Sequence, residues 1–328
     1  MVAVAQGRAG QGKGTVLGIA LASALTFGSS GIAAKPLIEA GLAPMHVVWL
    51  RVAGAALVLS PLAWRHRALL RERPALLAGF ALLGIAGVQA CYFAALSRIP
   101  VGVALLVEYL SPVIILGWVR FVRGRPVTWA AAVGVVLAVT GLACVVQVWS
   151  GLGFDSVGLL FALCASCCQA GYFLLADQGP DAGDRVPDPV GLIVHGFLIG
   201  AAVLTVLARP WNLDFAVLKE SVEMGTGSVP ALLLLAYLVF VATVFAYLTG
   251  VVSVRGLSAQ VAGVFACLEA VVAVALGWSL LDEHLSTPQL LGGAMVLAGA
   301  FIAQKSAPDG ARAPEDGTVP SARSSRPL

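Results

Sequence analysis

The chain has 328 residues, of which 59% are apolar and only 11% are charged, and its mean hydropathy is +0.93. Soluble domains carry about a quarter charged residues, so this composition excludes a water-soluble globular protein. A net charge of +3 gives no indication of a nucleic-acid partner, and we expect none.

Apolar stretches of about 20 residues follow one another along the chain. Each can cross ~30 Å of hydrocarbon at 1.5 Å per residue, and a helix satisfies its own backbone polar groups in lipid. We therefore predict an all-α integral membrane protein with ten transmembrane helices. The predicted spans are 16–35, 45–64, 75–96, 101–119, 129–148, 157–176, 190–207, 229–252, 258–281 and 287–303.

The two ends of the chain differ from the apolar spans. A cleaved signal peptide is an alternative for the first span, because Arg8 and Lys13 precede it and Ala33 and Ala34 follow. The apolar run is longer than a signal peptide needs, so we favour a membrane span after a short cytoplasmic tail, 1–14. Residues 305–328 are rich in Pro, Ser, Ala and Arg. We expect them to form a disordered cytoplasmic tail.

The basic residues predict the orientation. If the N-terminus is cytoplasmic, fifteen of the twenty Lys and Arg residues fall in inner segments, and only Lys35, Arg98, Arg209 and Lys219 fall outside. Cytoplasmic loops carry the excess of Lys and Arg in membrane proteins. We therefore expect a multi-pass protein of a bacterial inner membrane with both termini in the cytoplasm.

The six cysteines all lie within predicted spans and form no disulfide framework. Cys164, Cys167 and Cys168 share a helix face, which could suggest a soft-metal or thiol site. A helix contact is the better interpretation, since no histidine or second cysteine pair accompanies them. We predict no metal and no cofactor.

An internal repeat relates the two halves of the chain. Five spans in each half, an odd number, would turn the second half upside down relative to the first. Inverted repeats of this kind are typical of secondary transporters, whose substrate site lies between the halves near mid-membrane. We predict repeats at 15–148 and 149–304. A shift of 158 residues pairs Leu110 with Leu268, Gly134 with Gly292 and Gly141 with Gly299, and a shift of 140 pairs Gly18 with Gly158 and Gly31 with Gly171.

Two stretches of the repeats resemble a known family. Residues 97–141 (SRIPVGVALLVEYLSPVIILGWVRFVRGRPVTWAAAVGVVLAVTG) and 268–299 (LEAVVAVALGWSLLDEHLSTPQLLGGAMVLAG) resemble the EamA repeats of the drug/metabolite transporter superfamily. The runs IPVGVALLVEYLSP and AAKPLIEAG are most similar to its threonine/homoserine exporter branch. The resemblance implies a secondary active exporter of a small polar metabolite such as an amino acid, driven by the proton gradient.

The chain departs from the family pattern at two positions. Ala270 replaces the usual proline of a Leu-Glu-Pro run, which leaves open whether the ninth helix breaks there. Arg125 stands where the first repeat usually has a glutamate, whereas Glu283 keeps the second copy.

Two short motifs imitate enzyme chemistry. Residues 7–15 (GRAGQGKGT) match a phosphate-binding loop, but no buried strand precedes them and a membrane span follows. Residues 28–31 (GSSG) match the serine motif of rhomboid-type proteases, with His195 as a conceivable base. The inverted repeat has no place in such a protease. We expect no catalytic residue, although an intramembrane enzyme or a sensor remains the alternative class.

Charged residues within spans are the first candidates for a site. A charge at the bilayer centre costs on the order of 3 kcal/mol, so such residues usually face a partner or a water-filled cavity. Arg51, Glu108 and Glu269 fit this description. We expect the glutamates to bind substrate and exchange protons, with Arg51 as their positive partner. A purely structural ion pair between helices is the alternative.

Uncharged polar pairs complete the candidates. Gln89 and Tyr92 lie one turn apart on the third span, and Gln169 and Tyr172 repeat that spacing on the sixth. They could contact a substrate, or merely hydrogen-bond between helices. The expected partners are therefore a small-molecule substrate, protons and the lipid bilayer, and a homodimer remains open.

Overall fold

The computed structural model describes residues 15, 17–124, 126–147, 155–176, 189–225, 227–250 and 259–305. For residues 176, 189, 259–266, 304 and 305 it describes only the backbone. The predicted tails 1–14 and 306–328, Arg125 and the loop 177–188 lie outside the described residues.

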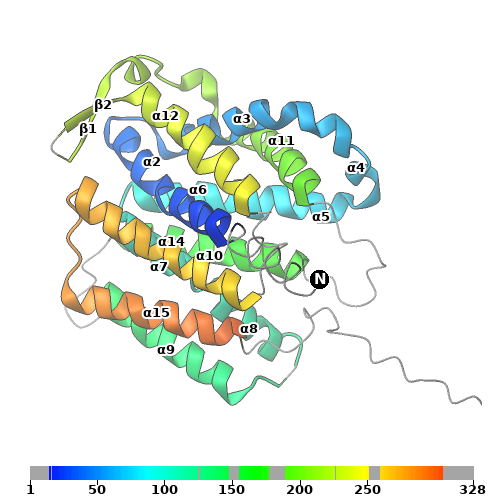
Figure 1. Ribbon diagram of the computed structural model, residues 1–328, viewed down its shortest axis with the longest axis vertical. Coiled ribbons are helices and arrows are strands. Elements are labelled where there is room, and N and C mark those ends of the chain that lie inside the picture. Colours follow the sequence, from blue (N-terminus) through cyan, green and yellow to red (C-terminus); the bar gives the residue numbers. More distant parts are fainter. Residues whose placement is uncertain are drawn as a thin grey trace, which may run out of the picture.

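Apolar helices dominate the described chain, and Figure 1 shows them packed as one bundle with a small β-hairpin at one end. Eight helices of the described part are long and apolar enough to cross a membrane. Cys267–Leu280 and Thr287–Ala303 are two shorter apolar helices. The first eight predicted spans agree with the eight long helices within a few residues at each end. The eight are Leu17–Glu39, Pro44–His66, Pro74–Leu96, Val101–Phe121, Trp129–Val146, Ser156–Leu175, Val190–Ala208 and Ala231–Gly250.

Several of these helices divide into shorter elements. In chain order the elements are α2 (Ser30–Glu39), α3 (Pro44–Ala63), η1 (Trp64–His66), α4 (Leu69–Glu72), α5 (Pro74–Gly79), η2 (Phe80–Gly87), α6 (Val88–Leu96), α7 (Val101–Glu108), α8 (Ser111–Phe121), α9 (Trp129–Val146), α10 (Ser156–Ala176), α11 (Pro189–Ala208), η4 (Pro210–Asn212), η5 (Val217–Lys219), β1 (Ser221–Met224), β2 (Gly227–Pro230), α12 (Ala231–Val239), η6 (Phe240–Phe245), α14 (Ala259–Leu280) and α15 (Thr287–Lys305). The antiparallel pair β1–β2 joins the end of α11 to α12.

Local chemistry sets the helix starts. The Thr128 hydroxyl accepts a hydrogen bond from the Ala131 amide at the start of α9. Asp155 accepts from the Val157 and Gly158 amides at the start of α10. These side chains satisfy amides that have no partner within their own helix. The bond from Gly158, helped by the Arg98 guanidinium, holds the pKa of Asp155 below its ordinary value.

The fourth predicted span breaks in mid-membrane, whereas α14 does not. Between α7 and α8 the chain turns at Tyr109 and Leu110, just before Pro112, which cannot donate a backbone hydrogen bond. In α14 the helix runs unbroken through Ala270. The absent proline explains this difference, and it answers the question that the sequence left open.

Two π-helical segments interrupt the third and eighth spans. These are η2 and η6, and a shift of 158 residues places η6 on η2. Within η6 the Thr243 hydroxyl donates to the Leu238 carbonyl, five residues back. Such π-bulges often occur at functional sites because they redirect side chains.

The helices α9 and α15 approach backbone to backbone, side by side at one edge of the bundle in Figure 1. A Cβ atom on Gly134 would lie 2.8 Å from the Gly299 carbonyl oxygen, and one on Gly141 would lie 2.6 Å from that of Gly292. The pairing order shows that the two helices run antiparallel. Small residues permit such close packing of membrane helices.

Polar contacts tie helix ends together at the end of the bundle that carries the β-hairpin, called the hairpin end below. Arg98 at the end of α6 pairs with Asp155 before α10 at 2.8 Å. His46 near the start of α3 hydrogen-bonds the Ala208 carbonyl at the end of α11 at 2.9 Å. The hairpin turn at Gly225 lies against the end of α14.

Candidate functional site

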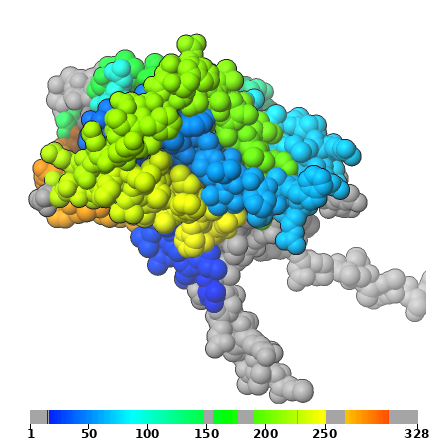
Figure 2. Space-filling model, turned by 90° about the horizontal axis from the view of Figure 1, so that it is seen from above, coloured from blue at the N-terminus to red at the C-terminus, as the bar shows by residue number. Residues whose placement is uncertain are grey.

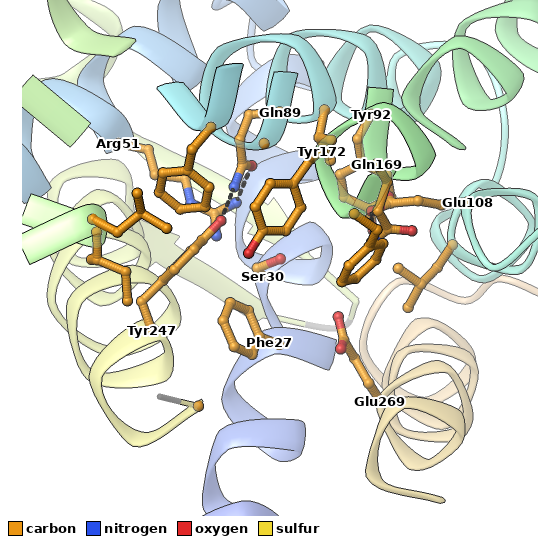
Figure 3. A pocket seen from close by; sticks show the side chains of 18 residues that line it. Phe27, Ser30, Arg51, Gln89, Tyr92, Glu108, Gln169, Tyr172, Tyr247 and Glu269 are labelled. Atoms are coloured by element: carbon orange, nitrogen blue, oxygen red, sulfur yellow. Dashed lines mark hydrogen bonds between the residues drawn. The ribbon is translucent and has the colours of Figure 1, made fainter. Parts of the chain in front are cut away.

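A cavity of about 410 Å³ lies in the interior of the bundle. It is called the central cavity below, and Figure 3 shows the side chains that line it. The structure brings all seven candidates from the sequence to this cavity. They are Arg51, Gln89, Tyr92, Glu108, Gln169, Tyr172 and Glu269.

One side of the central cavity is cationic. The Arg51 side chain is 2% exposed and donates three hydrogen bonds, to the Thr243 hydroxyl, to Gln89 Oε1 at 2.9 Å and to the Ala242 carbonyl at 3.0 Å. Its guanidinium carbon lies 5.3 Å from the centre of the Phe93 ring. All of these partners are neutral, so the positive charge of Arg51 remains available to a ligand.

Arg51, expected as the positive partner of the glutamates, does not bond to either of them among the described contacts. None of the ion pairs between described residues includes Arg51, and Figure 3 shows Arg51 across the cavity from Glu108 and Glu269. Instead, η6 presents the Thr243 hydroxyl and the Ala242 carbonyl to the guanidinium. A hydropathy pattern does not reveal such a partner.

Glu108 and Glu269 lie on the other side of the central cavity, each held by a neutral donor. The Gln169 amide donates to Glu108 Oε1 at 3.3 Å and accepts from the Ser111 hydroxyl at 2.6 Å. The Tyr109 hydroxyl donates to Glu269 Oε2 at 2.9 Å. Two carboxyl groups therefore face the cavity, and none of the ion pairs between described residues joins a cation to either of them.

The two predicted Gln–Tyr pairs lie on facing helices, α6 and α10. Gln89 belongs to the cationic side and Gln169 to the carboxylate side. The Tyr172 ring packs on Phe80 with 5.0 Å between ring centres and lies between the two charged sides in Figure 3. The glutamines bond between helices and also line the cavity, so contact with a substrate stays a prediction.

Sequence reasoning missed several residues of the site. Tyr247 lines the cavity and accepts a hydrogen bond from the Gln89 amide at 3.1 Å. Its ring packs edge-on against Phe27, 5.0 Å away. Ser30 also lines the cavity. The spacing of Thr243 and Tyr247, one turn apart in an apolar span, was the signal that could have found them.

The protease-like arrangement has no support in the geometry. His195 Nδ1 bonds the Gly191 carbonyl of its own helix at 2.9 Å. His195 does not line the central cavity, and no hydrogen bond between described residues joins it to Ser30.

The cysteines form a closer group than the sequence indicated. Cys91 on α6 lies within hydrogen-bonding reach of Cys168 on α10. One further cysteine thus joins the α10 group, although it is not the second cysteine pair that a metal site would need. Among the described residues no set of three or more His, Cys, Asp or Glu is placed to hold a metal ion.

Long apolar helices around an internal polar cavity define a multi-pass membrane protein. The chain belongs to the EamA-like transporter family, whose sequence profile matches residues 14–147 and 156–304. It is 27% identical over 218 residues to "Uncharacterized transporter YwfM" of Bacillus subtilis, covering 65% of this chain and 68% of that protein. It is also 26% identical over 215 residues to an "Uncharacterized transporter" of Archaeoglobus fulgidus, covering 65% and 71%.

A solved crystal structure has the same fold, with a TM-score of 0.57 and 18% identity over 88% of this chain and 96% of the other. At this level of identity the likeness concerns the fold alone. The protein is a transporter of the EamA family, and its relatives leave the substrate open.

Proposed function

We propose that the protein is a secondary active transporter that exports a small zwitterionic metabolite, an amino acid of the threonine or homoserine type, in exchange for protons. The observation that carries this proposal is the separation of charge across the central cavity, with Arg51 on one side and Glu108 and Glu269 on the other (Figure 3). A volume of about 410 Å³ lies in the range of small-ligand sites.

The cationic side suits the substrate carboxylate. Arginine has five N–H donors, and Arg51 uses three of them on Thr243, Gln89 and the Ala242 carbonyl. A guanidinium binds a carboxylate through charge-assisted hydrogen bonds of defined geometry. The Tyr247 hydroxyl beside it adds a second polar group.

The carboxylate side suits an ammonium group and also a proton. Glu108 and Glu269 each keep accepting capacity after the bonds from Gln169 and Tyr109. A substrate ammonium and a proton compete for the same oxygens. This competition couples outward movement of substrate to inward movement of protons without a separate coupling site.

Three features support two inverted five-helix repeats with ten spans, at 15–148 and 149–304. The glycine contacts of α9 with α15 link residues that a shift of 158 exchanges between the halves. The same shift superposes η2 and η6. It also relates Gln89 to Tyr247, which bond each other across the interface of the halves.

We further propose that the hairpin end faces the periplasm and that both termini are cytoplasmic, as the distribution of basic residues favours. Single cysteines near Glu220 and near Asp181, in a variant without native cysteines, test this orientation. An impermeant maleimide should label the first in intact cells and the second only in inverted vesicles. Labelling of the position near Asp181 in intact cells would contradict the orientation.

Transport by the purified protein in liposomes tests the function. The probes are labelled threonine and homoserine, with a cationic amine and a dicarboxylate as matched controls for charge. We expect saturable flux of the neutral zwitterions and little flux of the controls. If none of these probes moves, or only the charged controls do, the proposal is wrong.

A further inference from the structure

A largely buried contact of three groups lies at the hairpin end of the bundle. Lys35 Nζ on α2 pairs with Glu283 Oε1 at 2.5 Å, and the side chains are only 15% and 10% exposed. The Val101 amide, at the first residue of α7, donates to both oxygens of Glu283, at 3.1 and 3.0 Å. We call this contact the Lys35–Glu283 clasp. It joins α2, the start of α7 and the segment that follows α14.

The backbone after α14 is shaped to present Glu283. Asp282 adopts a left-handed conformation with φ of 56°, and the Glu283 amide bonds back to the Gly277 carbonyl at 3.0 Å. A Cβ atom on Gly277 would lie 2.9 Å from Glu283 Oε2. A side chain at position 277 would therefore displace the carboxylate from its place against the last turn of α14.

The start of α7 is a favourable place for this carboxylate. Pro100 precedes the helix, and the Val101 amide belongs to the first turn, where amides lack partners within the helix. A negative charge there also interacts favourably with the helix dipole. Lys35 neutralises the remaining charge, so the clasp is stable only while α2, α7 and the segment after α14 stay together.

Each element joined by the clasp also reaches the central cavity. Ser30 lies at the start of α2, Glu108 at the end of α7 and Glu269 within α14, and all three line the cavity. The clasp thus joins the outer ends of the helices that make up the carboxylate side of the cavity.

The region between the clasp and the cavity is sealed. Ala34, Val101 and Ala104 are fully buried. A Cβ atom on Gly31 would lie 2.5 Å from Val101 Cγ1, so α2 and α7 are in tight contact there. In contrast, the cavity lining reaches Leu192 and Gly250, close to helix ends on the other side of the bundle.

We propose that Lys35, Glu283 and the Val101 amide form the gate that closes the central cavity toward the hairpin end. The proposal rests on the transport function and assigns a role to residues outside the cavity. When the clasp opens, α2 can separate from α7 and α14, and the cavity becomes accessible from the hairpin end. The structure is then the state closed at that end.

Accessibility of a single cysteine tests the gate without knowledge of the substrate. Ser30→Cys, in a variant without the six native cysteines, places a thiol in the cavity. An impermeant maleimide is applied to each membrane face separately, in intact cells and in inverted vesicles. The rate of labelling from the hairpin end reports how often the gate is open.

The gate variants are Lys35→Met and Glu283→Gln, and the charge-swap pair is Lys35→Glu with Glu283→Lys. Each single change should raise the rate of labelling from the hairpin end by up to about fivefold, because loss of one ion pair shifts a two-state equilibrium by that factor. The charge swap should restore part of the slow labelling. The matched control is Arg98→Gln, which breaks the exposed Arg98–Asp155 pair at the same end and should change nothing.

Unchanged labelling in folded gate variants would overturn the proposal, because the clasp would then only hold helix ends together. If a single variant does not fold, Glu283→Asp, which keeps the charge but shortens the side chain, gives the same readout and should also raise labelling. Labelling and flux separate the two proposals. A clasp that gates labelling in a protein that moves no amino acid refutes only the proposed function.

Discussion

Arg51→Met removes the charge that we assign to the substrate carboxylate while keeping a long side chain. Arg51 is 2% exposed, and its three hydrogen bonds go to neutral acceptors. Loss of the Arg51 donors leaves buried acceptors at a cost of about 1–3 kcal/mol each, and removal of the desolvation cost of a buried charge offsets part of this. We therefore expect the variant to fold, with Gln89 still donating to Tyr247.

The expected loss of substrate affinity follows from the removal of one charge-assisted hydrogen bond. A hydrogen bond to a charged group contributes about 1.5–3 kcal/mol, which corresponds to about 10- to 150-fold in affinity. Arg51→Met should raise the KM for threonine by a factor in this range. The KM of Arg51→Lys should fall between those of the unmodified protein and Arg51→Met, because an ammonium keeps the charge but loses the planar fork of donors.

The assay is competition for labelled threonine uptake into liposomes by threonine and by its amide, which lacks the carboxylate charge. The unmodified protein should prefer threonine, and Arg51→Met should lose that preference. Arg98→Gln is the control for loss of a positive charge elsewhere in the protein. If Arg51→Met keeps the full preference for threonine, Arg51 serves packing alone and our assignment of the cationic side is wrong.

Three further predictions concern packing, thiols and pH. Gly299→Ala would place Cβ 2.5 Å from the Ala138 amide and the Gly134 carbonyl, so thermal unfolding should show a loss of about 1–3 kcal/mol in stability. Gly117→Ala, with open space around it, is the control and should be neutral. Equal effects of the two changes would refute the close packing of α9 with α15. Diamide, which takes up both thiol hydrogens, should join Cys91 to Cys168 in a disulfide. Mass spectrometry after alkylation should then count two fewer alkylated cysteines than in the untreated protein. If diamide also removes two alkylated cysteines from Cys91→Ser, the proximity of Cys91 and Cys168 is contradicted. The pKa of Asp155 is lowered on folding, so the stability that Asp155 contributes is present above its ordinary pKa and fades as pH falls through the lowered value. Asp155→Asn should remove this acid-side loss of thermal stability. An unchanged dependence of thermal stability on pH in the variant would refute this role of Asp155.

Hydropathy predicted the spans well because it measures a direct physical cost. A backbone in lipid must form its own hydrogen bonds, and the apolar runs needed for this are visible in the sequence. The same reasoning found the cavity residues. Arg51, Glu108 and Glu269 avoid lipid, and the interior of the bundle is the only other place for them.

The partners of these residues could not be predicted, because they depend on how each helix is rotated and bent. Thr243 reaches Arg51 from a π-helical segment that no periodicity in the sequence indicates. The sequence placed Lys35 only among the basic residues outside the membrane, whereas the structure pairs it with Glu283, 248 residues away. That pairing requires the left-handed turn at Asp282. Contacts between the halves are therefore the part that only the structure provides.

The central claim is that Glu108 and Glu269 couple substrate movement to protons, and the effect of an imposed pH gradient on threonine flux tests it most directly. The variants are Glu108→Gln and Glu269→Gln, which keep size and remove charge, and the control is Glu223→Gln on the exposed face of β1. We predict that the gradient accelerates flux in the unmodified protein and in the control but not in either cavity variant. If both cavity variants respond to the gradient normally, the two glutamates are structural, and the site must be sought among Gln89, Tyr92, Gln169 and Tyr172.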